Sequence, residues 1–72
     1  MISINGIQFA WEEGMTMKNA VTTALASEHF MHLNESQLIY MLNNSNILFG
    51  RLDKTIVCDN DEINIYTIAT GG

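Results

Sequence analysis

The sequence has no proline, a single cysteine and only three basic residues in 72. One cysteine, Cys58, cannot form an internal disulfide, so the fold does not depend on an oxidising compartment and the cytoplasm is the expected location. No proline, repeat, low-complexity tract or linker marks an internal boundary. We therefore expect residues 1–72 to form a single domain.

Basic residues are scarce: eight acidic side chains are balanced by only Lys18, Arg51 and Lys54, so the net charge is -5. Such a surface repels phosphate backbones and anionic lipids, so roles at nucleic acids or membranes are not expected. Long apolar runs are also missing, because residues 38–42 and 47–49 fall far short of the roughly 20 residues that span a membrane. Nor does a basic segment follow Met1, so no signal peptide is expected.

What the chain does have is enough apolar surface for a small core, with 47% hydrophobic residues. Near its start these residues alternate with polar ones on either side of Asn5-Gly6. The alternating residues are Ile2, Ile4, Ile7, Phe9 and Trp11. Asn-Gly favours a two-residue type I′ turn, which predicts a hairpin with Ile4 opposite Ile7 and Ile2 opposite Phe9.

A helix is predicted to begin near Met17, with Thr16 as its N-cap. The apolar stripe expected to face a sheet consists of Met17, Ala20, Val21, Ala24 and Leu25. This periodicity is lost from Ser27 to Glu35, which we interpret as the end of the helix and a connection. The conformation of residues 29–37 stays open.

The second half predicts further sheet elements. They are a strand at residues 38–42, a turn at 43–46, a short strand at 47–49, a helical turn at 52–55, a return to the sheet at 56–58 and a last strand from residue 62. The fold class is therefore α+β with a β-grasp order: a mixed four- to five-stranded sheet with one main helix packed across it. A right-handed crossover through the helix would place the first and last strands side by side in the centre.

The last strand runs from a polar turn at residues 59–61 towards Gly71-Gly72. Alternation places Ile63 and Ile65 on one face, and Tyr66, Ile68 and Thr70 on the other. A diglycine has no side chains, so a narrow tunnel in another protein admits it, and its terminal carboxylate is a candidate substrate.

Five segments together carry a family resemblance. They are Ile-Ser-Ile-Asn-Gly at residues 2–6, Gly-Met-Thr at 14–16, Leu-Asn-Asn at 42–44, Asp-Asn-Asp-Glu-Ile at 59–63 and Gly71-Gly72. Over nearly its whole length the chain resembles the ThiS/MoaD family of ubiquitin-like sulfur carriers, more the ThiS branch of thiamine biosynthesis than the MoaD branch of molybdopterin synthase. Asn60 and Thr70 stand where the family often has glycine. Thr70 shortens the flexible tail expected at about 69–72.

The resemblance implies a carrier that is not itself an enzyme. A ThiF-like adenylyltransferase would use Mg-ATP to activate the carboxylate of Gly72. A sulfur donor such as a cysteine desulfurase would then convert it to a thiocarboxylate, and a ThiG-like thiazole synthase would take the sulfur. Thr70 and Gly71 would thread into these partners. The carrier itself would bind no cofactor or metal and would be a monomer when free.

Other interpretations remain open for the chain as a whole. They are a MoaD-like role in molybdopterin synthesis, a ubiquitin-like modifier that forms an isopeptide bond through Gly72, and an interaction module with an inert tail. For Tyr66 and Ile68, docking of a partner and ordinary sheet packing are equally open.

The remaining chemically active side chains favour structural roles. Cys58 follows Ile56 and Val57, which favours a buried thiol. His29 and His32 have no evident third ligand, so we interpret them as an exposed or half-buried pair. Glu12 and its neighbour Glu13 flank a turn, where carboxylates are normally solvated or cap backbone amides.

Overall fold

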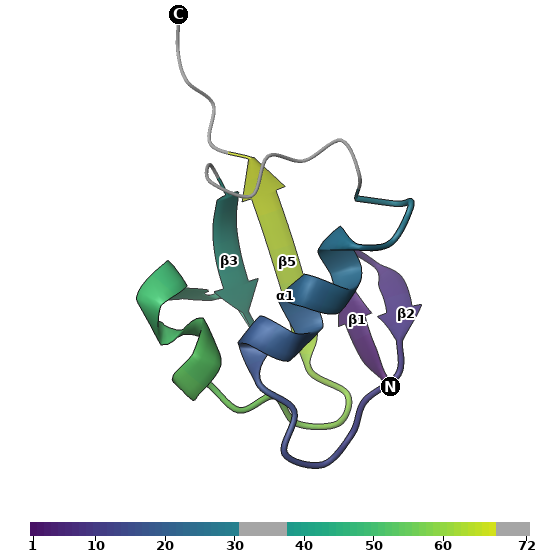
Figure 1. Ribbon diagram of the computed structural model, residues 1–72, viewed down its shortest axis with the longest axis horizontal. Helices are drawn as coiled ribbons and strands as arrows, with labels where there is room; N and C mark the ends of the chain where they lie inside the picture. The colour runs from purple at the N-terminus through teal and green to yellow at the C-terminus, as the bar shows by residue number, and fades with distance from the viewer. Residues whose placement is uncertain (31–37, 68–72) are drawn as a thin grey trace, which may run out of the picture.

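A five-stranded mixed sheet, crossed on one face by a single α-helix, makes up the residues described by the computed structural model, 1–30 and 38–67 (Figure 1). The elements are β1 (Ile2–Ile4), β2 (Ile7–Phe9), α1 (Met17–Leu25), β3 (Leu38–Leu42), β4 (Ser45–Ile47), the 3-10 helix η2 (Phe49–Lys54) and β5 (Glu62–Thr67). The strand order is β2-β1-β5-β3-β4, and only the β1–β5 pair is parallel. This confirms the predicted α+β, β-grasp architecture, with the last strand beside the first in the centre.

The first hairpin has the predicted register, with Ile4 opposite Ile7 and Ile2 opposite Phe9. Its turn residues Asn5 and Gly6 have φ of 52° and 82°. Positive φ at both positions is what a type I′ turn requires, and Asn and Gly tolerate it best. β2 ends at Phe9, opposite Ile2 at the start of β1, and so stops two residues before the predicted Trp11. The indole of Trp11 donates to the carbonyl of Val57 at 2.8 Å.

Helix α1 begins where predicted, after Thr16. The Thr16 hydroxyl accepts from the backbone N–H of Asn19 at 3.1 Å, and the Asn19 side chain accepts from the N–H of Thr16 at 3.0 Å. This reciprocal pair satisfies two amides at the helix start. No helix within the described residues is long and apolar enough to span a membrane.

The core lies between α1 and the inner face of the sheet (Figure 1). α1 contributes Met17, Ala20, Val21 and Ala24, so the predicted stripe is buried except for the half-buried Leu25. The other buried members are Ile2, Ile4, Phe30, Leu38, Tyr40, Leu52, Val57, Ile63 and Ile65.

The predicted turn at residues 43–46 is too long. Asn43 and Asn44 alone form the turn, with φ of 48° and 71°. Because two residues with positive φ complete a hairpin, Ser45 pairs at once with Leu42 and opens β4.

The predicted strand at residues 47–49 is wrong beyond Ile47, the last residue of β4. Phe49 begins η2 instead, and its ring lies 6.3 Å from that of Tyr40. Leu48 and Phe49 are both 66% exposed. The helical turn predicted at 52–55 thus begins earlier.

The predicted burial of Cys58 is also wrong. Cys58 is exposed, whereas its neighbour Val57 is fully buried. Residues 56–58 do not enter a strand and form one isolated bridge, between Ile56 and Thr16. The extended backbone points alternate side chains in opposite directions, so burying Val57 turns Ile56 and Cys58 outward.

Candidate functional site

β5 is the strand that leads towards the diglycine, and it lies between β1 and β3 (Figure 1). On one side Ile4 pairs with Ile63, and on the other the register runs from Leu42–Ile63 to Leu38–Thr67. Residues 68–72 lie outside the described residues. The predictions for Ile68, Thr70, Gly71 and Gly72 therefore stay predictions.

The turn before β5 is fixed by local hydrogen bonds. Asp61 accepts the backbone N–H of Cys58 on its carboxylate at 2.7 Å and returns its own N–H to the Cys58 carbonyl at 3.1 Å. Asn60 has a φ of 72°, a left-handed conformation that glycine and asparagine adopt most readily. Asparagine therefore fits this position of the turn.

The start of the chain is also joined to this turn before β5. The carbonyl of Met1 accepts from the N–H of Asn60 at 2.8 Å, and the amino group of Met1 forms an exposed ion pair with Asp59 at 2.5 Å.

Two asparagine side chains hold β5 from opposite sides. Asn43, in the β3–β4 turn, accepts the N–H of Glu62 at 2.9 Å and donates to Asp61 at 2.9 Å. Asn5, in the β1–β2 turn, accepts the N–H of Ile65 at 2.7 Å and donates to the Ile65 carbonyl at 2.9 Å. The first residue of β5 and a residue near its end are thus both tied to neighbouring hairpin turns.

Along β5 the alternation separates core from surface as predicted. Ile63 and Ile65 are buried, while Tyr66 is 52% exposed. Ile39, directly opposite Tyr66 on β3, is 37% exposed. An exposed apolar pair therefore lies on the sheet face opposite α1, just before the tail.

Ile39 was not identified from the sequence. Its alternation with buried Leu38 and Tyr40 indicates an outward position. Its pairing with Tyr66 depends on the register of two distant strands, which the sequence alone does not fix.

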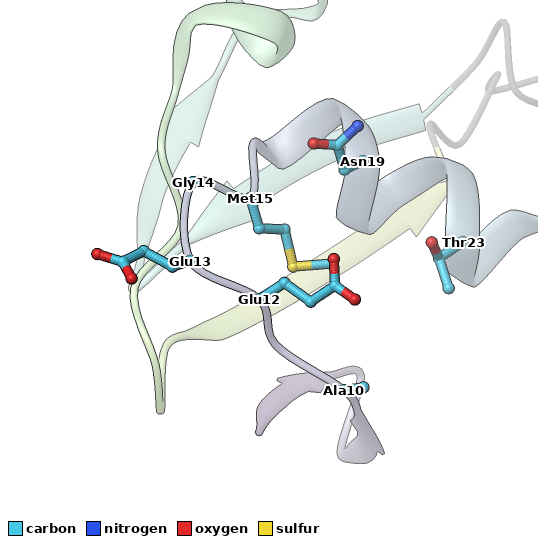
Figure 2. A pocket seen from close by; sticks show the side chains of 7 residues that line it. All are labelled: Ala10, Glu12, Glu13, Gly14, Met15, Asn19 and Thr23. Carbon is cyan, nitrogen blue, oxygen red and sulfur yellow. The ribbon is translucent and has the colours of Figure 1, made fainter.

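A separate hollow of about 500 Å³ lies between α1 and the segment that precedes it (Figure 2). It is lined by Ala10, Glu12, Glu13, Gly14, Met15, Asn19 and Thr23. The Asn19 amide is already engaged in the helix cap, and both glutamates are exposed, as predicted for turn-flanking carboxylates. This lining offers no base paired with a nucleophile, the arrangement that a hydrolytic site needs.

Metal ligands are not clustered either. Within residues 1–30 and 38–67, no three His, Cys, Asp or Glu side chains form a group that could hold a metal ion. His29 is exposed, and His32 lies outside the described residues. The end of β5 and the Ile39–Tyr66 pair therefore form the candidate functional site.

Comparison with solved structures identifies the architecture. The crystal structure of the thiamine biosynthesis protein ThiS from Geobacter metallireducens matches with a TM-score of 0.68, covering 99% of this chain and 97% of that chain. The chain has the fold of ThiS. Sequence identity is 16%, so the likeness concerns the fold. No protein-family model matches the chain, and no curated protein matches it in sequence.

Proposed function

We propose that this chain is a protein-based sulfur carrier whose terminal Gly72 carboxylate is activated and converted to a thiocarboxylate. The observation that carries the proposal is the path of β5. The strand is held in the centre of a ThiS-like sheet and runs to Thr67, just before the sequence ends in Gly71-Gly72. A strand held in a sheet, with two glycines following a few residues later in the sequence, suits delivery of a chain end into a partner's active site.

The chemistry belongs to the partners. A carboxylate is a poor electrophile, so a ThiF-like adenylyltransferase would join Gly72 to AMP from Mg-ATP and release pyrophosphate. The outer sulfur of a persulfide, such as that of a cysteine desulfurase, would attack the carbonyl and expel AMP, giving an acyl disulfide. A thiol would then cleave the S–S bond, leaving a thiocarboxylate on Gly72 and a disulfide in the donor system. Use of ATP suits the cytoplasm.

The exposed pair at the end of β5 gives such partners a surface to recognise. Tyr66 and Ile39 present apolar area at the end of β5, the last described strand before residues 68–72. An aromatic ring with a polar tip is a common anchor at protein interfaces. Ile68 extends this docking surface in the proposal, and Thr70 and Gly71 thread into the active site.

The thiazole of thiamine is the proposed destination of the sulfur, because the matching structure is a thiamine biosynthesis protein. A ThiG-like thiazole synthase would be the acceptor. Binding to a molybdopterin-synthase large subunit instead would assign the MoaD-like role. Adducts on target lysines that resist thiol reduction would indicate a protein modifier.

The test is intact mass spectrometry after incubation with Mg-ATP, the cognate adenylyltransferase and a sulfur donor. The expected product has the mass of the chain with one oxygen replaced by sulfur, located at Gly72 by fragmentation. A chain lacking Gly71 and Gly72 is the matched control and should stay unmodified. An unchanged Gly72 with a partner that is active on its own carrier would reject the proposal.

A further inference from the structure

Asn5 extends the pairing of β5 beyond the end of β1. The backbone pairing of the two strands covers only Ser3–Glu62 and Ile4–Ile63, because the chain turns away at Asn5. β5 nevertheless continues to Thr67. Without a further partner, the backbone of Ile65 would have no hydrogen bonds on the side of β5 that faces β1.

The carboxamide of Asn5 supplies both missing bonds. Its oxygen accepts the N–H of Ile65 at 2.7 Å, and its nitrogen donates to the Ile65 carbonyl at 2.9 Å. The backbone N–H of Asn5 also donates to the carbonyl of Ile63 at 2.9 Å. A side-chain amide has the same donor and acceptor as a peptide group, so Asn5 acts as one more residue of the ladder.

Ile65 is the last residue of β5 with a buried side chain, and Tyr66 of the proposed docking surface follows it. Its side chain is 3% exposed, whereas that of Tyr66 is 52% exposed. In the described residues, Tyr66 and Thr67 are paired with β3 alone, opposite Ile39 and Leu38. Among residues 1–30 and 38–67, Asn5 is therefore the last attachment of β5 on the β1 side.

The geometry points to Asn5 as a positioning residue that fixes the direction in which β5 delivers Gly72 to an activating enzyme. This inference rests on the proposed function. A docked carrier reacts only while its terminal carboxylate is in the active site, and a strand end that pivots at Ile65 spends less time there. When the Asn5 bonds are removed, the docking surface keeps its pairing with β3. The expected effect is therefore a lower rate of reaction after binding and not weaker binding.

The experiment compares Asn5→Gly with Asn44→Gly. Both replace an asparagine with positive φ in a two-residue hairpin turn, so the effect of glycine on the backbone is matched. The Asn44 side chain has no hydrogen-bond partner among the described residues. Only Asn5→Gly removes bonds to β5.

Adenylation by the cognate enzyme is then measured at varied carrier concentration. We expect Asn5→Gly to lower kcat about tenfold with KM changed less than about twofold, and Asn44→Gly to match the wild type. Amide exchange at Ile65 should accelerate at least about tenfold in Asn5→Gly alone. If Asn5→Gly does not fold, Asn5→Asp serves, since it keeps the acceptor for Ile65 and loses the donor, and its kcat should fall several-fold.

The two proposals fail differently. Wild-type kcat in the folded Asn5 variant overturns the positioning role and leaves the carrier function standing. A rise in KM with kcat unchanged, or an equal fall in the kcat of Asn44→Gly, also overturns it. A wild-type chain that an active partner does not adenylate overturns the proposed function and the positioning role together.

Discussion

Ile39 and Tyr66 lie directly opposite each other on β3 and β5, and both are exposed. Side chains opposite each other on antiparallel strands lie side by side on the same face. The pair therefore forms one apolar surface on the side of the sheet away from α1. Its position near the end of β5, the last described strand before Gly72 in the sequence, makes it the surface to test for docking.

Tyr66→Ala is expected to raise the KM of the carrier for its adenylyltransferase about tenfold, because truncation removes an aromatic anchor from the interface. The free energy of unfolding should fall by less than about 1 kcal/mol, since half of the side chain is already exposed. Steady-state kinetics and urea unfolding measure the two effects.

Ile56→Ala is the matched control for Tyr66→Ala. Ile56 is 56% exposed and lies outside the five strands, in an isolated bridge with Thr16 at the start of α1. The KM of Ile56→Ala should equal that of the wild type. An unchanged KM in Tyr66→Ala, or an equal rise in Ile56→Ala, would contradict docking through the Ile39–Tyr66 pair.

Asn43→Gly is expected to lower the free energy of unfolding by about 1–2 kcal/mol, because it removes the bonds to Glu62 and Asp61 while tolerating positive φ. The neighbouring substitution Asn44→Gly removes no hydrogen bond among the described residues and should change stability by less than about 0.5 kcal/mol. Urea unfolding followed by circular dichroism compares the two. Equal losses would show that the greater backbone freedom of glycine, and not the loss of the side-chain bonds, dominates.

Much of this architecture was predictable because its signals are local. Asn5-Gly6 fixes the turn and hence the register of the first hairpin, and Thr16 marks the helix start. The alternation around Ile63 and Ile65 likewise identifies β5 and its buried face. Each of these signals acts within a few residues, so the sequence alone reveals it.

What could not be predicted depends on contacts between distant residues. The bonds from Asn5 to Ile65 and from Asn43 to Glu62 span 60 and 19 residues. Nothing in a turn asparagine indicates whether its side chain will face solvent or a neighbouring strand. The opposition of Ile39 and Tyr66 is similarly a product of strand register.

Trp11 illustrates a contact of the same kind. Its indole N–H donates to the Val57 carbonyl at 2.8 Å and ties the end of the first hairpin to the segment before β5. Trp11→Phe keeps an aromatic ring but leaves that carbonyl without its donor. We expect a loss of about 1–2 kcal/mol in the free energy of unfolding, measured by urea unfolding with circular dichroism.

A second substitution separates the hydrogen bond of Trp11 from its packing. Trp11→Ala removes the ring as well and should cost at least about 1 kcal/mol more than Trp11→Phe, because Trp11 is half-buried against the core. If Trp11→Phe is as stable as the wild type, the indole bond makes no net contribution.

The reactivity of Cys58 reports on which side of the backbone its side chain lies. Because its thiol is exposed beside buried Val57, it should react fully with a thiol-specific reagent in the folded protein. Denaturant should raise the reaction rate by less than about tenfold, whereas a core thiol would react only on unfolding. Cys58→Ser serves as the unreactive control and should alter the free energy of unfolding by less than about 0.5 kcal/mol. Protection of the thiol until unfolding, or a large destabilisation by serine, would instead place Cys58 in the core.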